Sequence, residues 1–160
     1  MKLLIFFSCF LYLSVKGQNY RHSKDKNIKT LYTVFDQLRS GNYNKDGLYK
    51  EHFYHSPAGK PDRSESEVVY YKDTLFGEFH QLLTQATNFN ILPLANAKKQ
   101  LGDSIVTYNY YYEGQKNTIY VLWTDTEKRK YDHIGYCLML NGKIVSLEGY
   151  TKDKAFIRWR

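Results

Sequence analysis

The segment EHFYH, residues 51–55, brings a glutamate and two histidines together, and these are residue types that bind zinc. The zinc signature of metalloproteases has its histidines four positions apart with the glutamate between them, whereas here Glu51 precedes both His52 and His55. No cysteine lies nearby to complete a set of ligands. We therefore predict that the histidines lie at a helix end on the surface, and that the protein holds no metal and needs no cofactor.

The sequence also contains no clear motif for acid–base or nucleophilic catalysis. The sequence has no G-x-S-x-G motif, and Asp132 and His133 would point to opposite faces of an expected strand. His133 and Glu148 would share a face diagonally across a hairpin, where an ordinary cross-strand pair is the simpler interpretation. We name no catalytic residue, although an enzyme built on this sequence would have His55, His80 or Glu148 available as an acid or base.

The sequence is rich in aromatic residues, with 16 tyrosines, 9 phenylalanines and an aromatic share of 17%. The stretch VTYNYYYEG places Tyr108 and Tyr110 on one face of an expected strand. A tyrosine has a flat apolar ring and one polar tip, which suits a cavity that orients an amphipathic ligand. Packing within a sheet or at a dimer contact would use the same residue types. The residues that we expect to line a ligand site are Tyr54, Phe79, Tyr108, Tyr110, Trp123, Tyr136 and Leu147.

Helices are expected in the first half of the chain. Apolar residues recur at steps of three and four over residues 28–38, which predicts a helix with one buried face. Ser40 and Gly41 end it, because glycine readily takes the left-handed conformation of a helix stop. We expect a short helix over residues 46–52, a loop over 54–66, and a longer helix over 75–86 with Asp73 as its N-cap.

Strands are expected after residue 87, where the apolar period changes to two. The expected strands cover residues 89–95, 104–112, 118–124, 132–140 and 143–150. Asn141-Gly142 predicts a type I′ hairpin, which pairs Leu140 with Lys143. Continued without interruption, this register pairs Leu138 with Val145, Tyr136 with Leu147 and Ile134 with Gly149. That apolar face should meet the helices, while the face with His133, Gly135, Cys137, Ser146, Glu148 and Tyr150 should meet water or a second subunit.

This order of elements predicts one α+β domain, with helices packed on a curved antiparallel sheet. Two long helices cannot cover five strands completely, so we expect an opening between helices and sheet that could hold a ligand.

The first 17 residues have the pattern of a secretory signal peptide. Lys2 precedes an apolar run over residues 3–13, and Val15 and Gly17 have the spacing of a cleavage site before Gln18. We expect residues 18–160 to form the mature, secreted or periplasmic domain, and the run is too short to serve as a transmembrane segment. A lipidation site at Cys9 is an alternative.

The mature chain would retain Cys137 as its only cysteine, and so could form no internal disulfide. Without Lys2 and Lys16 its formal charge falls from +7 to +5. The basic residues are scattered apart from the stretch EKRKY at residues 127–131. Nucleic-acid binding would need a basic stripe with interleaved aromatic residues, and export would remove the usual nucleic-acid partners, so we predict no such partner.

Four stretches, LRSGN, YHSPAGKPDRS, LFGEFHQLL and NGKIVSLEGY, resemble in their order and spacing the nuclear transport factor 2-like superfamily. The likeness is to its SnoaL-like and steroid isomerase-like branches and covers nearly the whole mature chain. It implies a cone-shaped sheet, or cystatin-like roll, around a helix-lined cavity, and a homodimer formed through the sheet.

The isomerase chemistry of that superfamily does not carry over. The carboxylate base that the resemblance implies before the P-x-G loop is Ser56 here, and serine cannot act as that base. The positions that correspond to the tyrosine and the protonated aspartate of the isomerase-like branch are Val34 and Ile134. We therefore expect no steroid isomerase activity.

Together these features predict an exported, non-catalytic domain that binds a small apolar or amphipathic molecule. A hydrolase, dehydratase or cyclase of the SnoaL-like branch and a dimerisation module without ligand are the alternatives.

Overall fold

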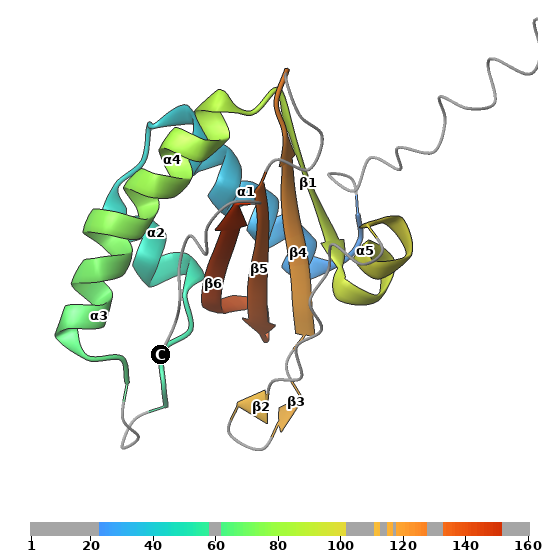
Figure 1. Ribbon diagram of the computed structural model, residues 1–160. Coiled ribbons are helices and arrows are strands. Elements are labelled where there is room, and N and C mark those ends of the chain that lie inside the picture. Colours follow the sequence, from blue (N-terminus) through green and yellow to red (C-terminus); the bar gives the residue numbers. More distant parts are fainter. Residues whose placement is uncertain are drawn as a thin grey trace, which may run out of the picture.

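The computed structural model describes residues 23–57, 62–101, 111–112, 115–116, 118–127 and 133–151. These residues form an α+β structure in which helices pack on a four-stranded antiparallel sheet, as predicted (Figure 1). The helical elements are α1 (Lys26–Ser40), α2 (Lys45–His52), α3 (Glu65–Tyr70), the π-helical segment η2 (Tyr71–Leu75), α4 (Phe76–Gln85) and α5 (Leu94–Leu101). The strands are β1 (Asn88–Pro93), β2 (Tyr111–Tyr112), β3 (Gln115–Lys116), β4 (Thr118–Asp125), β5 (His133–Leu140) and β6 (Lys143–Thr151).

Helix α1 has the ends and the buried face that its sequence predicts. The Asp25 side chain caps it by accepting hydrogen bonds from the backbone amides of Asn27 and Ile28. Gly41 ends it at φ +70°, and a Cβ there would lie 3.0 Å from Cε1 of His80. Glycine is therefore required at this stop for both its conformation and its size. The buried face of α1 consists of Ile28, Leu31, Tyr32, Val34, Phe35 and Leu38.

The second long helix begins ten residues earlier than predicted, because α3, η2 and α4 follow one another without a break. Ser64, and not Asp73, is the N-cap. The Ser64 hydroxyl accepts from the Glu67 amide at 3.3 Å, and the Glu67 carboxylate accepts from the Ser64 amide at 2.8 Å. Asp73 lies inside η2 and pairs with Lys45 at 3.2 Å. The two hydrogen bonds between Ser64 and Glu67 form a capping box, which starts a helix where the sequence predicted the end of the loop.

The sheet has the order β1-β4-β5-β6 and is not strongly curled, so the expected cone shape is not confirmed. Strand β1 stops at Pro93, and α5 follows where the sequence predicted further strand. Most of the strand predicted over residues 104–112 lies outside the described residues. Its end, Tyr111–Tyr112, forms a short antiparallel ladder with β3.

The β5–β6 hairpin confirms the predicted turn but not the predicted register. Asn141 and Gly142 have φ values of +52° and +78°, as a type I′ turn requires, and Leu140 pairs with Lys143. After Met139 the register shifts by one residue, so that Leu138 pairs with Ser146 while Val145 is the extra residue of a β-bulge. The predicted pairings beyond the turn are therefore wrong. Tyr136 pairs with Glu148, and Ile134 with Tyr150.

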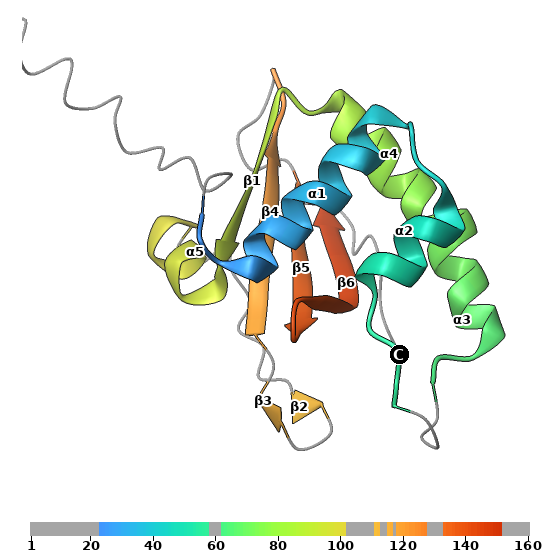
Figure 2. The same ribbon diagram turned by 180° about the vertical axis from the view of Figure 1, so that it is seen from behind.

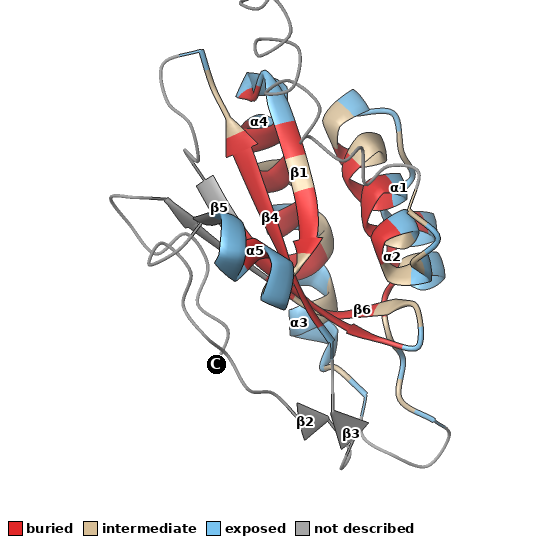
Figure 3. Ribbon diagram, turned by 90° about the vertical axis from the view of Figure 1, so that its right-hand side faces the viewer, coloured by how far each residue is buried: buried red, intermediate tan, exposed pale blue. Residues whose placement is uncertain are grey.

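The bulge puts Val145 and Leu147 of β6 on opposite faces of the sheet, while β5 keeps one alternation whose two faces are the reverse of the predicted ones. Cys137 and Leu147 form a pair on the face covered by α1, α2 and α4, which makes the prediction for Cys137 wrong. Tyr136 and Val145 belong to the opposite face, where α5 packs, and not to the helix-covered face where they were expected. Figure 3 shows that buried residues run along the sheet between these two sides. No helix of the described residues is long and apolar enough to cross a membrane.

Candidate functional site

The two faces of the sheet carry two separate apolar layers. The first layer packs under α1, α2 and the long helix and contains most of the core, including Phe35, Phe53 and Phe76. The second apolar layer lies on the other face and consists of Tyr54, Leu92, Leu94, Ala97, Ile119, Val121, Trp123, Tyr136, Leu138, Leu140 and Val145.

The predicted ligand-site residues divide between these layers. Phe79 and Leu147 belong to the first layer, in which they are 1% and 0% exposed. Tyr54, Trp123 and Tyr136 belong to the second. Tyr108 and Tyr110 lie outside the described residues. The structure thus brings together three of the predicted residues, one from the loop after α2 and two from the central strands.

The second apolar layer consists of aliphatic and aromatic side chains. Its members carry no carboxylate, imidazole or amine. Trp123 and Tyr136 are almost fully buried in it, and Tyr54 lies half-buried at its edge. Each of these three side chains combines a large apolar ring with one polar atom.

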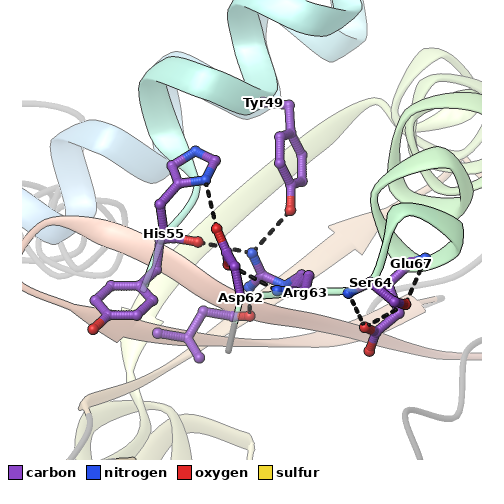
Figure 4. A network of polar contacts seen from close by, with 8 residues as sticks. Tyr49, His55, Asp62, Arg63, Ser64 and Glu67 are labelled. Carbon is purple, nitrogen blue, oxygen red and sulfur yellow. Dashed lines mark hydrogen bonds and ion pairs between the residues drawn. The ribbon is translucent and has the colours of Figure 1, made fainter. Parts of the chain in front are cut away.

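Arg63 joins the layer to the rest of the molecule (Figure 4). Its guanidinium donates to the carbonyl of Tyr54 at 2.9 Å, to the hydroxyl of Tyr49 at 3.0 Å and to the carbonyl of Val145. Both carbonyls belong to residues of the second apolar layer. Next to them, the Tyr54 amide donates to the Ile144 carbonyl at 2.9 Å, and Phe53 forms a parallel bridge with Ile144. The loop after α2 is thereby fixed against the β6 bulge. We call Arg63 and these contacts the Arg63 junction.

Aromatic rings surround the guanidinium. The Cζ atom of Arg63 lies 5.1 Å from the ring centre of Tyr71, 5.9 Å from that of Tyr49 and 6.0 Å from that of Phe53. Burial raises the pKa of Tyr71 far above its ordinary value, and the nearby Arg63 charge opposes this only in part. Tyr71 therefore stays a neutral phenol, and this junction holds its cation with carbonyl oxygens and ring faces.

His55 and Asp62 lie beside the Arg63 junction on the exposed side. Their Nδ1 and Oδ2 atoms are 3.4 Å apart, and the two side chains are 43% and 45% exposed. Burial raises the pKa of Asp62, but hydrogen bonds from the amides of Arg63 and Ser56 and from His55 outweigh it, so the pKa lies below its ordinary value. The pair therefore joins the two ends of the loop as an ordinary surface contact.

Three other titratable residues were considered from the sequence: His80, His133 and Glu148. His80 donates from Nδ1 to the Leu38 carbonyl at 2.7 Å, which ties α4 to the end of α1. Glu148 lies opposite Tyr136 and His133 opposite Thr151, so the expected diagonal His133–Glu148 pair is wrong. In the ranges that the structure describes, no three histidine, cysteine, aspartate or glutamate side chains are placed to hold a metal ion.

Arg63 is not among the residues predicted to be functional, because its position was expected to lie inside a loop. The capping box formed by Ser64 and Glu67 was a signal for a helix start directly after this residue. Nothing local pointed to the Val145 carbonyl, because that acceptor is 82 residues away in the chain. A comparison of the chain with models of known protein families, with curated proteins and with solved structures finds no match.

Proposed function

We propose that the protein is an exported, non-catalytic domain that binds a small apolar or amphipathic molecule at the second apolar layer. One observation carries the proposal. The sheet has buried apolar side chains on both faces, although an antiparallel sheet commonly leaves one face to water. Among the described side chains, the eight-residue helix α5 contributes Leu94 and Ala97 to the second layer, whereas α1, α2, η2 and α4 cover the first.

The composition of the layer supports binding over catalysis. A catalytic site needs an acid, base or nucleophile near the substrate, and the residues that form the layer are apolar or aromatic. Glu148, which pairs with Tyr136 in the sheet, is the acid that the alternative enzyme would use. Of the acid–base residues considered for an enzyme, His80 is engaged by the Leu38 carbonyl and His55 by Asp62. These contacts favour a binding domain over the SnoaL-like enzyme.

The resemblance to the nuclear transport factor 2-like superfamily is part of the same proposal. The order of helices followed by an antiparallel sheet supports it. The chain would be a member with a flatter sheet than the cone-shaped roll, and a homodimer, if formed, would use a face of that sheet.

Trp123 can report on occupancy of the layer. The sequence has two tryptophans, so Trp159→Phe leaves Trp123 as the only one. Titration of residues 18–160 carrying this change with oleate should alter Trp123 emission in a saturable way, with one oleate per chain. Tyr54→Ala should weaken oleate binding, while Tyr54→Phe, which keeps the ring, should bind nearly as well.

The alternatives give different results. Unchanged Trp123 emission with oleate, with the fold verified by near-ultraviolet circular dichroism, would argue against the ligand site. If Trp123 emission changes with protein concentration and not with oleate, and light scattering gives the mass of a dimer, the layer would be a contact between subunits.

A further inference from the structure

Three lysines surround the start of α1. Lys24 precedes the helix, and Lys26 and Lys29 lie in its first turn and a half, all with exposed side chains. The first turn contains no acidic residue. The N-terminus of a helix carries a positive partial charge, so lysines placed there slightly destabilise the helix. Their presence is therefore not explained by the stability of α1.

Two other elements add lysines at the same place. The Cε and Nζ atoms of Lys26 lie 3.0 and 3.5 Å from the position that a Cβ on Gly142 would take, so this side chain covers the tip of the β5–β6 hairpin. Lys143 follows Gly142 and donates to the Glu51 carbonyl at the end of α2, next to Lys50. We call Lys24, Lys26, Lys29, Lys50 and Lys143 the basic corner.

The acidic groups near the basic corner leave most of its charge uncompensated. The Asp25 carboxylate is occupied by the Asn27 amide at 2.8 Å and by the Tyr120 hydroxyl at 2.8 Å. The Glu51 carboxylate lies 3.7 Å from His52. Over the described part of the chain, Lys24, Lys26 and Lys29 have no carboxylate within ion-pair distance.

Two lysines of α2 and η2 are paired with carboxylates. Lys45 and Lys72 form ion pairs with Asp73 and Asp46, at 3.2 and 2.6 Å, between α2 and η2. The acidic side chains of Glu65 and Glu67 lie on α3, which Figures 1 and 2 place on the other side of the molecule from the start of α1. Among the described residues, the basic corner therefore brings five lysines together next to the two carboxylates of Asp25 and Glu51, and this excess of positive charge can attract a polyanion.

We propose that the basic corner binds a sulfated polysaccharide. An anionic lipid surface would call for exposed apolar side chains next to the lysines, and the exposed large apolar residues of the described ranges, Val69 and Tyr70, lie on α3. A nucleic acid would call for exposed aromatic rings on which bases stack, and the corner offers none among its described residues. The proposal uses the predicted export of the chain but is independent of the ligand site.

Heparin binding tests the proposal. The double substitution K26Q/K29Q should lower the salt concentration at which residues 18–160 elute from immobilised heparin. It should also weaken binding at fixed salt by roughly tenfold and reduce the salt dependence of the affinity. Because both side chains are exposed, the variant should keep the thermal unfolding temperature of the parent protein.

The matched control is K98Q/K99Q, which removes the same charge from exposed lysines of α5, on the other face of the sheet (Figure 3). This variant should retain nearly full heparin affinity. Equal losses in the two variants would mean that only net charge acts, and the proposal would be overturned. It would also be overturned if phosphatidylserine vesicles captured the protein and heparin did not compete.

Discussion

The guanidinium of Arg63 contacts three segments that lie far apart in the sequence. It bonds the Tyr49 hydroxyl in α2, the Tyr54 carbonyl in the following loop and the Val145 carbonyl in the β6 bulge. A planar guanidinium can donate in several directions at once and stack on rings, whereas an ammonium group is a compact point charge. This geometry, and not charge alone, is what the junction requires.

Arg63→Lys should therefore destabilise the protein although it keeps the charge. Lysine cannot reach the three acceptors together, and a buried carbonyl that loses its donor costs about 1–3 kcal/mol. We expect a loss of about 2 kcal/mol in the free energy of unfolding, measured with urea. Binding at the second apolar layer should weaken as well, because two of its residues lose their anchor.

Arg39 offers the matched control. It donates to one carbonyl, that of Ala86, at 3.0 Å, and its Cζ lies 5.9 Å from the ring centre of Phe89. Arg39→Lys keeps the charge and removes a simpler set of contacts, so it should cost clearly less than Arg63→Lys. Equal costs for the two substitutions would contradict the special role of Arg63.

At the scale of elements, the capping box fixes where the long helix starts and so where Arg63 lies. Ser64 holds the first turn of α3 through its hydroxyl and amide, and the preceding residue is Arg63. No residue of α3 is buried, so packing contributes little to this start. The start of α3 therefore depends on its cap more than the start of α1 does, because α1 also has a buried face.

Ser64→Ala should cost about 1 kcal/mol of stability, the usual loss for an N-cap. Amide hydrogen exchange should accelerate in α3 more than in α4, whose residues Phe76, Phe79 and Leu83 are buried. Ser64→Thr keeps the hydroxyl and should restore most of both effects. Uniform acceleration along the whole helix would show that the cap does not act locally.

The features predicted correctly from the sequence depend on neighbours along the chain. The face of α1, its stop at Gly41 and the Asn141-Gly142 turn each follow from a few adjacent residues. The bulge at Val145 does not, because the Val145 carbonyl accepts from Arg63, 82 residues away. The bulge puts Val145 and Leu147 on opposite faces of the sheet and makes Glu148, and not Leu147, the partner of Tyr136. Tyr136 and Leu147, which were predicted to face each other, therefore lie in different layers.

At the scale of the whole molecule, groups outside the sheet bond part of each of its two edges. On β6, the Tyr54 amide, Arg63 and the Tyr71 hydroxyl bond the backbone of Ile144, Val145 and Leu147. On β1, the Ile91 amide donates to the Tyr32 hydroxyl at 3.3 Å. Occupied edges disfavour pairing with strands of another chain. Any homodimer should therefore form through a face of the sheet.

The free energy of unfolding should depend on pH, and carboxyl groups with lowered and with raised pKa values should act on it in opposite directions. The Ser64 hydrogen bonds lower the pKa of Glu67, and the Lys72 hydrogen bond lowers that of Asp46, so both favour folding above pH 4.5 and lose this as pH falls. Burial raises the pKa of Glu78, which acts in the opposite direction. These carboxyl groups act at acidic pH, so a change near neutral pH has to come from histidine.

His52 is the histidine that should act there. Its side chain is 12% exposed, and burial lowers its pKa below 6.5, with Lys143 adding to the shift and Glu51 opposing it. The folded protein then binds fewer protons than the unfolded chain, so stability is full above pH 6.5 and falls as pH decreases below it. Thermal unfolding from pH 7.5 to 5 should show this decline, and His52→Gln should reduce it. His55→Gln should not, because His55 is 43% exposed. A decline of the same size in His52→Gln would show that proton uptake in this range occurs elsewhere.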